Sequence, residues 1–330
     1  MAQVLLIGLG AGAASALLFA SLISGSVLAI LLFYLAALPI MLAAIAWSHM
    51  AGLLALLFGA LSLAGVLNFW IAFVYLAAVA TPAYVLAYMS MLGREVAPAS
   101  GTAPAEMEWY PVGRLIVWAA LIAFALVTIV ILQFGVDFET YKKTIRATFE
   151  QVLKLQARVS GDQPLKLPGV QSPERFLDTL VAIMPPAAAL LSMLTSLINL
   201  WLAGRVARVS GRLRRPWPDL TAVSLPLAAA VLLGVSLVVS FAGGMPGFVA
   251  AIAVSLLMVA FAIAGFSALH AITRNVNART WLLAGAWFAV MLLGWPLLFV
   301  ALLGIADTIF DLRGKVAARK PPFPPIQPNS

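Results

Sequence analysis

The chain contains no cysteine, and only 10% of its 330 residues are Asp, Glu, Lys or Arg. The absence of cysteine excludes disulfide bonds, thiolate metal sites and cysteine nucleophiles. It also gives no information about whether the protein lies in an oxidising or a reducing compartment. Soluble domains carry about 25% charged residues. The shortage of charge, together with 63% hydrophobic residues, therefore identifies an integral membrane protein whose solvent is the lipid bilayer.

The first 93 residues contain no Asp, Glu, Lys or Arg, and His49 is their only histidine. A helix needs about 20 apolar residues to cross the hydrocarbon core, so this segment predicts a charge-free unit of about four transmembrane helices. No basic residue precedes the first apolar stretch, and that stretch does not stop at a small-residue cleavage site. We therefore expect it to remain in the mature protein as a helix.

The remaining composition predicts four further regions: a loop and fifth transmembrane helix, an external amphipathic segment, C-terminal transmembrane helices and a disordered Pro-rich tail (residues 94–134, 135–178, 179–312 and 313–330). In the amphipathic segment, apolar residues such as Phe138, Tyr141 and Ile145 recur at three- and four-residue steps. Such a helix either lies on the lipid headgroups or covers a cavity. The predicted fold is an all-α, polytopic transmembrane bundle of about nine crossings, with eight and ten as the alternatives.

Positive charge predicts the orientation of the chain. Five arginines and one acid lie in the short segment Gly204 to Leu220, which the positive-inside rule places in the cytoplasm. Counting crossings backwards puts the amphipathic segment outside and the N-terminus inside. The last apolar stretch, 281–305, is expected to be one crossing, although basic residues follow it. The alternative is a break at Gly294-Trp295-Pro296 after which the chain turns back.

A stripe of small residues marks the first helix. Its members recur every fourth position, which places them on one face, where another helix backbone can approach closely: Gly8, Gly12, Ala16 and Ala20. This face is a candidate for packing against helices of the same chain or against a partner subunit.

The helix ending near Ala203 has the most polar character. Pro185 and Pro186 each remove a backbone donor, so we expect them to break its hydrogen-bond ladder. Polar side chains in hydrocarbon seek protein partners or water, so its polar side should face the bundle interior or a cavity. The candidate cavity-facing residues are Pro185, Pro186, Ser192, Thr195, Ser196 and Asn199. They act either as structural links between helices or as part of a ligand path.

No catalytic, cofactor-binding or metal-ligating constellation stands out. The sequence has no GxxxxGK[ST] phosphate loop and no HExxH motif, and no ionisable residue lies at the expected centre of a crossing. Asp307 and Asp311 are four residues apart, but the nearby Arg313 and Lys315 favour ion pairing over metal binding. His49 has no second ligand nearby and suits the headgroup level. These absences predict that the protein is neither an enzyme nor a nucleic-acid-binding protein, and that its surroundings are the lipid bilayer.

Four segments carry a resemblance to a known family: the small-residue stripe of the first helix, LFYLAALPI from Leu32, EWYPVGR from Glu108 and GIADTIFDLR from Gly304. Together they resemble the YybS-like family of uncharacterised bacterial inner-membrane proteins, over nearly the whole chain. That family is distantly similar to the substrate-binding S components of energy-coupling-factor transporters and to the rod-shape protein MreD. The resemblance implies a bacterial inner-membrane location and, for the matching positions Gly8, Gly12, Ala16 and Ala20, docking on a coupling subunit.

Two functions remain open from the sequence. The first is a transport-related, substrate-binding subunit that lacks its own energy source, binds an unidentified small solute and associates with other membrane subunits through its first helix. The alternative is an MreD-like structural or scaffold protein of the cell envelope, with the amphipathic segment as its outer contact surface. The chain differs from S components in having about nine crossings instead of about six, so no substrate specificity transfers.

Overall fold

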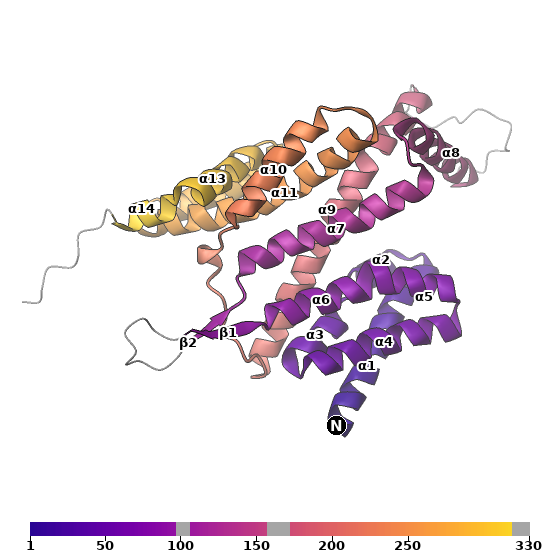
Figure 1. The fold of residues 1–330 in the computed structure, drawn as a ribbon, viewed down its shortest axis with the longest axis horizontal. Helices are drawn as coiled ribbons and strands as arrows, with labels where there is room; N and C mark the ends of the chain where they lie inside the picture. Colours follow the sequence, from indigo (N-terminus) through magenta and orange to yellow (C-terminus); the bar gives the residue numbers. More distant parts are fainter. Residues whose placement is uncertain (97–105, 157–171, 319–330) are drawn as a thin grey trace, which may run out of the picture. The chain divides into compact units, whose positions relative to one another are not determined.

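A computed structural model describes residues 1–96, 106–156 and 172–318, which are almost entirely helical (Figure 1). They belong to two compact units: Met1–Trp217 with Val235–Leu256, and Pro218–Gly234 with Leu257–Ser330. Two helices, α10 (Leu227–Ser240) and α11 (Gly244–Ile272), contribute residues to both units. The predicted all-α membrane bundle is confirmed, and each unit is described separately.

The charge-free N-terminal segment forms a series of short and long helices: α1 (Ala2–Ala20), α2 (Val27–Tyr34), α3 (Leu38–Ala46), α4 (His49–Val66), α5 (Phe69–Tyr75) and α6 (Thr81–Ser90). Polar residues define three of the helix starts. The side chains of Ser26, Ser48 and Asn68 each accept a hydrogen bond from the backbone N–H three residues later. This bond satisfies a donor that the first helical turn otherwise leaves unpaired.

A β-hairpin lies where the sequence predicts an exposed loop. Strand β1 (Gly93–Val96) pairs antiparallel with β2 (Glu106–Trp109), and Arg94 lies opposite Glu108 with 2.6 Å between their charged groups. The alternation of polar and apolar residues in Glu106-Met107-Glu108-Trp109 is typical of a strand and was the missed signal. Residues 97–105 of the predicted loop are not among the residues that the structure describes.

The first unit is built on close helix contacts. Helix α1 packs along α4, α3 contacts α4, α6 and α9, and α7 (Val112–Phe134) runs beside α9 (Pro173–Val209) (Figure 1). Many of the buried side chains are alanine, including Ala43, Ala51, Ala55, Ala119 and Ala123. Small side chains let helix backbones approach closely, which is how helices gain contact in a membrane, where lipid tails are as apolar as leucine.

The predicted amphipathic helix is α8 (Phe138–Gln156), and it packs on α7 and α9. Tyr141 is buried and its ring lies 5.3 Å from that of Phe248. Lys142 and Arg146 on α8 both pair with Asp178 of α9, at 3.7 and 3.4 Å. Apolar burial and ion pairs thus attach α8 to its neighbours within the first unit.

The second unit contains parts of α10 and α11 together with α12 (Arg279–Leu293), α13 (Leu297–Phe310) and α14 (Leu312–Ala318). Helices α11 and α13 cross through Gly265 and Gly304. A Cβ atom at Gly265 would overlap the carbonyl of Val300, and one at Gly304 would overlap the carbonyl of Phe261. Nearby, the Phe266 and Trp287 rings stack with centroids 4.0 Å apart.

Seven helices of the described residues are long and apolar enough to cross a membrane: Ala2–Ser24, Val27–Ala46, His49–Val66, Phe69–Ser90, Val112–Phe134, Glu174–Val209 and Gly244–Asn275. Helices α10, α12 and α13 are apolar but shorter. The prediction of one continuous helix over 281–305 is wrong, because α12 ends at Leu293 and α13 begins at Leu297. Gly294 between them has a φ of 72°, in the left-handed region that a side chain disfavours. The break at Gly294-Trp295-Pro296, which belonged to the alternative, is confirmed, and the turning back of the chain after it stays a prediction.

Candidate functional site

The apolar segment around Pro39 forms two helices with an interruption between them. Helix α2 ends at Tyr34 and α3 begins at Leu38, where the N–H of Leu38 donates to the carbonyl of Leu35 at 3.0 Å. That N–H would have engaged the Tyr34 carbonyl in a continuous helix. The interruption therefore frees the Tyr34 oxygen for a partner elsewhere.

A second irregularity lies between α5 and α6, where the helix continues through a π-helical turn. Residues Leu76–Ala80 form a π-helical turn, and Pro82 follows in the first turn of α6. Proline lacks the N–H that an α-helix requires at this point, so the chain changes its hydrogen-bond register before it. Single π-turns inside helices occur frequently at functional sites.

Asn199 of α9 is almost fully buried, with 1% of its surface exposed. Its Nδ2 donates to the freed carbonyl of Tyr34 at 2.7 Å and to the carbonyl of Thr195 at 2.9 Å. One side chain thus ties the first interruption to α9. This position matches the structural-link alternative predicted for the polar side of α9.

A cavity of about 270 Å³ lies where the α2–α3 interruption and the π-helical turn face α9. Its walls come from the end of α2, the π-helical turn and one side of α9: Phe33, Tyr34, Ala37, Ala78, Val79, Ala188, Leu191, Ser192, Thr195 and Ser196. We call it the hydroxyl cavity. Three predicted residues, Ser192, Thr195 and Ser196, are half-buried in its wall. Within the described part of the chain, their hydroxyl groups have no hydrogen-bond partner.

A buried network that sequence reasoning missed also reaches the first interruption. The hydroxyl of Tyr75 donates to Ser15 Oγ at 2.8 Å, and Ser15 Oγ donates to the carbonyl of Ala36 at 2.5 Å. Both side chains are fully buried. Gly59 makes room for Tyr75, because a Cβ there would overlap the hydroxyl. The signal was a lone serine beside Ala16 of the small-residue stripe.

The two prolines of α9 do not end the helix, which is continuous from Pro173 to Val209, and they are not among the residues that line the hydroxyl cavity. The missing N–H of Pro185 leaves the carbonyl of Val181 without its partner in the ladder. The Tyr141 hydroxyl of α8 donates to that oxygen at 3.4 Å. Burial raises the pKa of Tyr141 to about 12.

The small-residue stripe of α1 lies against α4 at its first positions. A Cβ at Gly8 would overlap Leu54, and one at Gly12 would lie 2.5 Å from the carbonyl of Ala55. Ala16 is buried, whereas Ala20 is half-buried. A helix of the same chain therefore covers Gly8 and Gly12.

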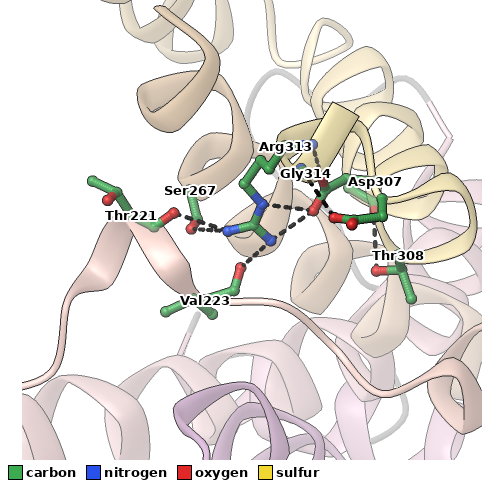
Figure 2. Close-up of polar contacts among 9 residues, drawn as sticks. Thr221, Val223, Ser267, Asp307, Thr308, Arg313 and Gly314 are labelled. Carbon is green, nitrogen blue, oxygen red and sulfur yellow. Dashed lines mark hydrogen bonds and ion pairs between the residues drawn. The ribbon is translucent and has the colours of Figure 1, made fainter. Parts of the chain in front are cut away.

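Asp307 and Asp311 have separate partners. The guanidinium of Arg313 donates from Nη2 and Nε to Asp307 at 2.6 and 2.9 Å, and it also reaches the carbonyls of Thr221 and Val223 (Figure 2). Asp311 accepts from the N–H of Gly314 at 3.1 Å. This is the ion pairing that the neighbouring basic residues predicted for Asp307.

No described residues form a group of three or more His, Asp or Glu side chains that would suit a metal ion. His49 begins α4, and its ring meets Tyr88 edge to face at 5.9 Å. The lining of the hydroxyl cavity contains hydroxyl groups, aliphatic side chains and an aromatic pair, with no charged residue. Such a lining suits a small neutral molecule that combines polar groups with an apolar body.

The apolar helices and the charge-free first 93 residues together define a multi-pass helical membrane protein. Residues 13–308 match the family described as "Predicted membrane protein (DUF2232)", and the chain belongs to that family. No curated protein and no solved structure matches the chain. The likenesses to S components and to MreD remain predictions.

Proposed function

We propose that the protein is a transport-related membrane subunit, located in the bacterial inner membrane, that binds a small neutral solute in the hydroxyl cavity. One observation carries this proposal: an interrupted helix, a π-helical turn and three hydroxyl groups converge on one cavity. Interrupted transmembrane helices form the substrate sites of many transporters, because irregular backbone at membrane depth is tolerated where it lines a cavity.

The hydroxyl groups support a binding role on energetic grounds. Ser192, Thr195 and Ser196 have no hydrogen-bond partner among the described residues, and polar groups at membrane depth are costly unless paired. A solute with donors and acceptors would supply the missing partners. Asn199 lies in the same helix but already bridges Tyr34 and Thr195, so we assign it to maintaining the cavity.

The energy source would belong to another protein, because the sequence contains no nucleotide-binding motif and no ionisable residue at the expected centre of a crossing. Gly8 and Gly12 do not support docking of that partner, since α4 covers them. A partner would have to contact another surface.

The test is a thermal-shift screen of neutral solutes against the purified protein in detergent, because a bound solute stabilises only the state that binds it. A solute that raises the melting temperature should lose this effect in a variant with Ser192→Ala, Thr195→Val and Ser196→Ala. Thr179→Val is the matched control: it lies in the same helix, and its hydroxyl bonds to the carbonyl of Arg175.

Absence of any stabilising solute, or equal stabilisation of the triple variant, would contradict the proposal. In that case the envelope scaffold becomes the better explanation. It predicts altered cell shape without altered solute uptake when the gene is deleted.

A further inference from the structure

Three loops of the first unit meet at one end of its helices. Arg214 donates from Nη2 to the carbonyl of Trp47 at 3.2 Å, and Arg215 donates from Nη1 to the carbonyl of Ser90 at 2.7 Å. The turn after α3, the end of α6 and the arginine-rich segment therefore lie together. Counting crossings assigned all three to the same side of the membrane, the side that the positive-inside rule makes cytoplasmic.

A cavity of about 350 Å³ lies at this junction. We call it the arginine cavity, and its polar and aromatic lining residues are Trp47, Ser48, His49, Tyr88, Trp109 and Arg214. No Asp or Glu is among the residues that line it. Tryptophan and tyrosine concentrate at the level of lipid headgroups, so the composition of the wall is that of a membrane–water interface.

The arginine-rich segment that supplies Arg214 to the cavity has no counter-charge within the described chain. Arg205, Arg208, Arg212, Arg214 and Arg215 form no ion pair with any carboxylate that the structure describes. Arg212 instead lies 4.7 Å above the ring of Trp47. Arg214 uses one of its donors on the Trp47 carbonyl, and the planar guanidinium has five.

Two further features favour an anion at this position. Helix α4 begins at His49, so the wall of the cavity includes the electropositive end of that helix. The indole Nε1 of Trp47 is a buried donor with no acceptor among the described residues. The cavity wall thus combines the start of α4 with the guanidinium of Arg214 from a distant segment of the chain.

We propose that the arginine cavity binds a phosphate group, supplied by the headgroup of an anionic membrane lipid. The aromatic wall places the cavity at headgroup depth, and basic pockets between transmembrane helices on the cytoplasmic side suit phosphate-bearing lipids. Arg214, which lines the cavity, holds the phosphate oxygens by charge-assisted hydrogen bonds, and Arg212, over the ring of Trp47, adds positive charge beside it. This site is separate from the hydroxyl cavity and does not depend on the function proposed for it.

The experiment is a lipid titration of the full chain in mild detergent, followed by native mass spectrometry and thermal unfolding. Phosphatidylglycerol should bind and raise the melting temperature, whereas phosphatidylcholine should have a much smaller effect. Arg212→Gln and Arg214→Gln should each weaken phosphatidylglycerol binding about tenfold, as expected for loss of one charge-assisted contact. Arg208→Gln is the control: it removes the same charge, but Arg208 stacks on Trp217, at 5.2 Å.

Inorganic phosphate distinguishes the two sources of the anion. If it stabilises the protein in an Arg214-dependent manner and phosphatidylglycerol does not, the phosphate site stands but the lipid source is wrong. Equal weakening by Arg208→Gln and Arg214→Gln, or equal binding of both lipids, would overturn the proposal. Arg214→Gln also removes a backbone contact, so Arg212→Gln, which removes no hydrogen bond, separates lost binding from lost folding.

Discussion

The side-chain amide of Asn199 donates a 2.7 Å hydrogen bond to the carbonyl oxygen of Tyr34, 165 residues earlier in the chain. That oxygen is free because the helix is interrupted before Pro39, so a break in one transmembrane helix is satisfied by a polar side chain of another. The hydroxyl cavity lies beside this bond, with Tyr34 in its wall. Its shape therefore depends on a contact that neither helix can make alone.

Replacing Asn199 with alanine should lower the stability of the protein by about 1–2 kcal/mol, because the Tyr34 carbonyl loses its partner in a buried environment. Thermal unfolding in detergent measures the effect. Asn275→Ala is the matched control, since Asn275 is exposed. Equal melting temperatures for the two variants would contradict the assigned role.

Leucine at Gly12 should destabilise the protein by about 1–3 kcal/mol or more, through overpacking against α4. The same substitution at Gly10 should have little effect, because a Cβ there meets no described atom within 4 Å. Both substitutions lie in α1 and change helix propensity equally. The recovery of monodisperse protein and its melting temperature provide the comparison. Similar losses of stability in both variants would contradict a close contact between Gly12 and α4.

Arg313→Ala should cost about 3–5 kcal/mol, because it leaves the buried Asp307 carboxylate without its partner. Arg274→Ala should cost at most about 1 kcal/mol, since its ion pair with Asp219 is exposed and 3.9 Å long. Adding Asp307→Asn to Arg313→Ala should recover part of the loss. If the double variant is no more stable than Arg313→Ala, the ion pair is not the source of the effect.

Stability should fall at high pH through Tyr141. Its pKa is about 12 in the folded protein and about 10 in an unfolded chain. Between these values the unfolded chain releases a proton that the folded protein retains, so the free energy of unfolding decreases as pH rises from about 10 to about 12. Tyr141→Phe should reduce this decrease, measured as melting temperature against pH. A pH profile unchanged by the substitution would show that Tyr141 does not contribute.

The predicted orientation can be measured directly, because the chain contains no cysteine to give background. In intact cells, a membrane-impermeant maleimide should label Ala242→Cys and should label Ser210→Cys only after permeabilisation. Both positions are exposed. The reverse pattern would invert the proposed orientation, with the N-terminus outside.

Hydrophobic length and turn residues predicted most helices of the first unit, because each transmembrane helix must satisfy its own backbone in lipid. The same reasoning failed over 281–305, where apolar composition continues through a break. Composition cannot distinguish one long helix from two short ones when both are apolar. The β-hairpin was missed because its strands have only four residues each.

The polar residues of α9 were found from sequence because hydroxyl and amide groups are conspicuous in an apolar segment. The sequence could not predict which of them has a structural role and which lines the cavity. Asn199 bonds to Tyr34, whereas Ser192, Thr195 and Ser196 line the cavity. Ser15 and Tyr75 escaped notice, since a single serine or tyrosine in a membrane helix is common. Only their 2.8 Å contact, across 60 residues of chain, reveals the network.

The sequence by itself determined that this is a multi-pass helical membrane protein, because charge and hydropathy act locally on every residue. It also indicated which loops share a side, since crossings alternate. The tertiary structure alone decided where the polar groups go. An orphaned carbonyl such as that of Tyr34, or five arginines without a carboxylate, becomes meaningful only through neighbours that are distant in the sequence.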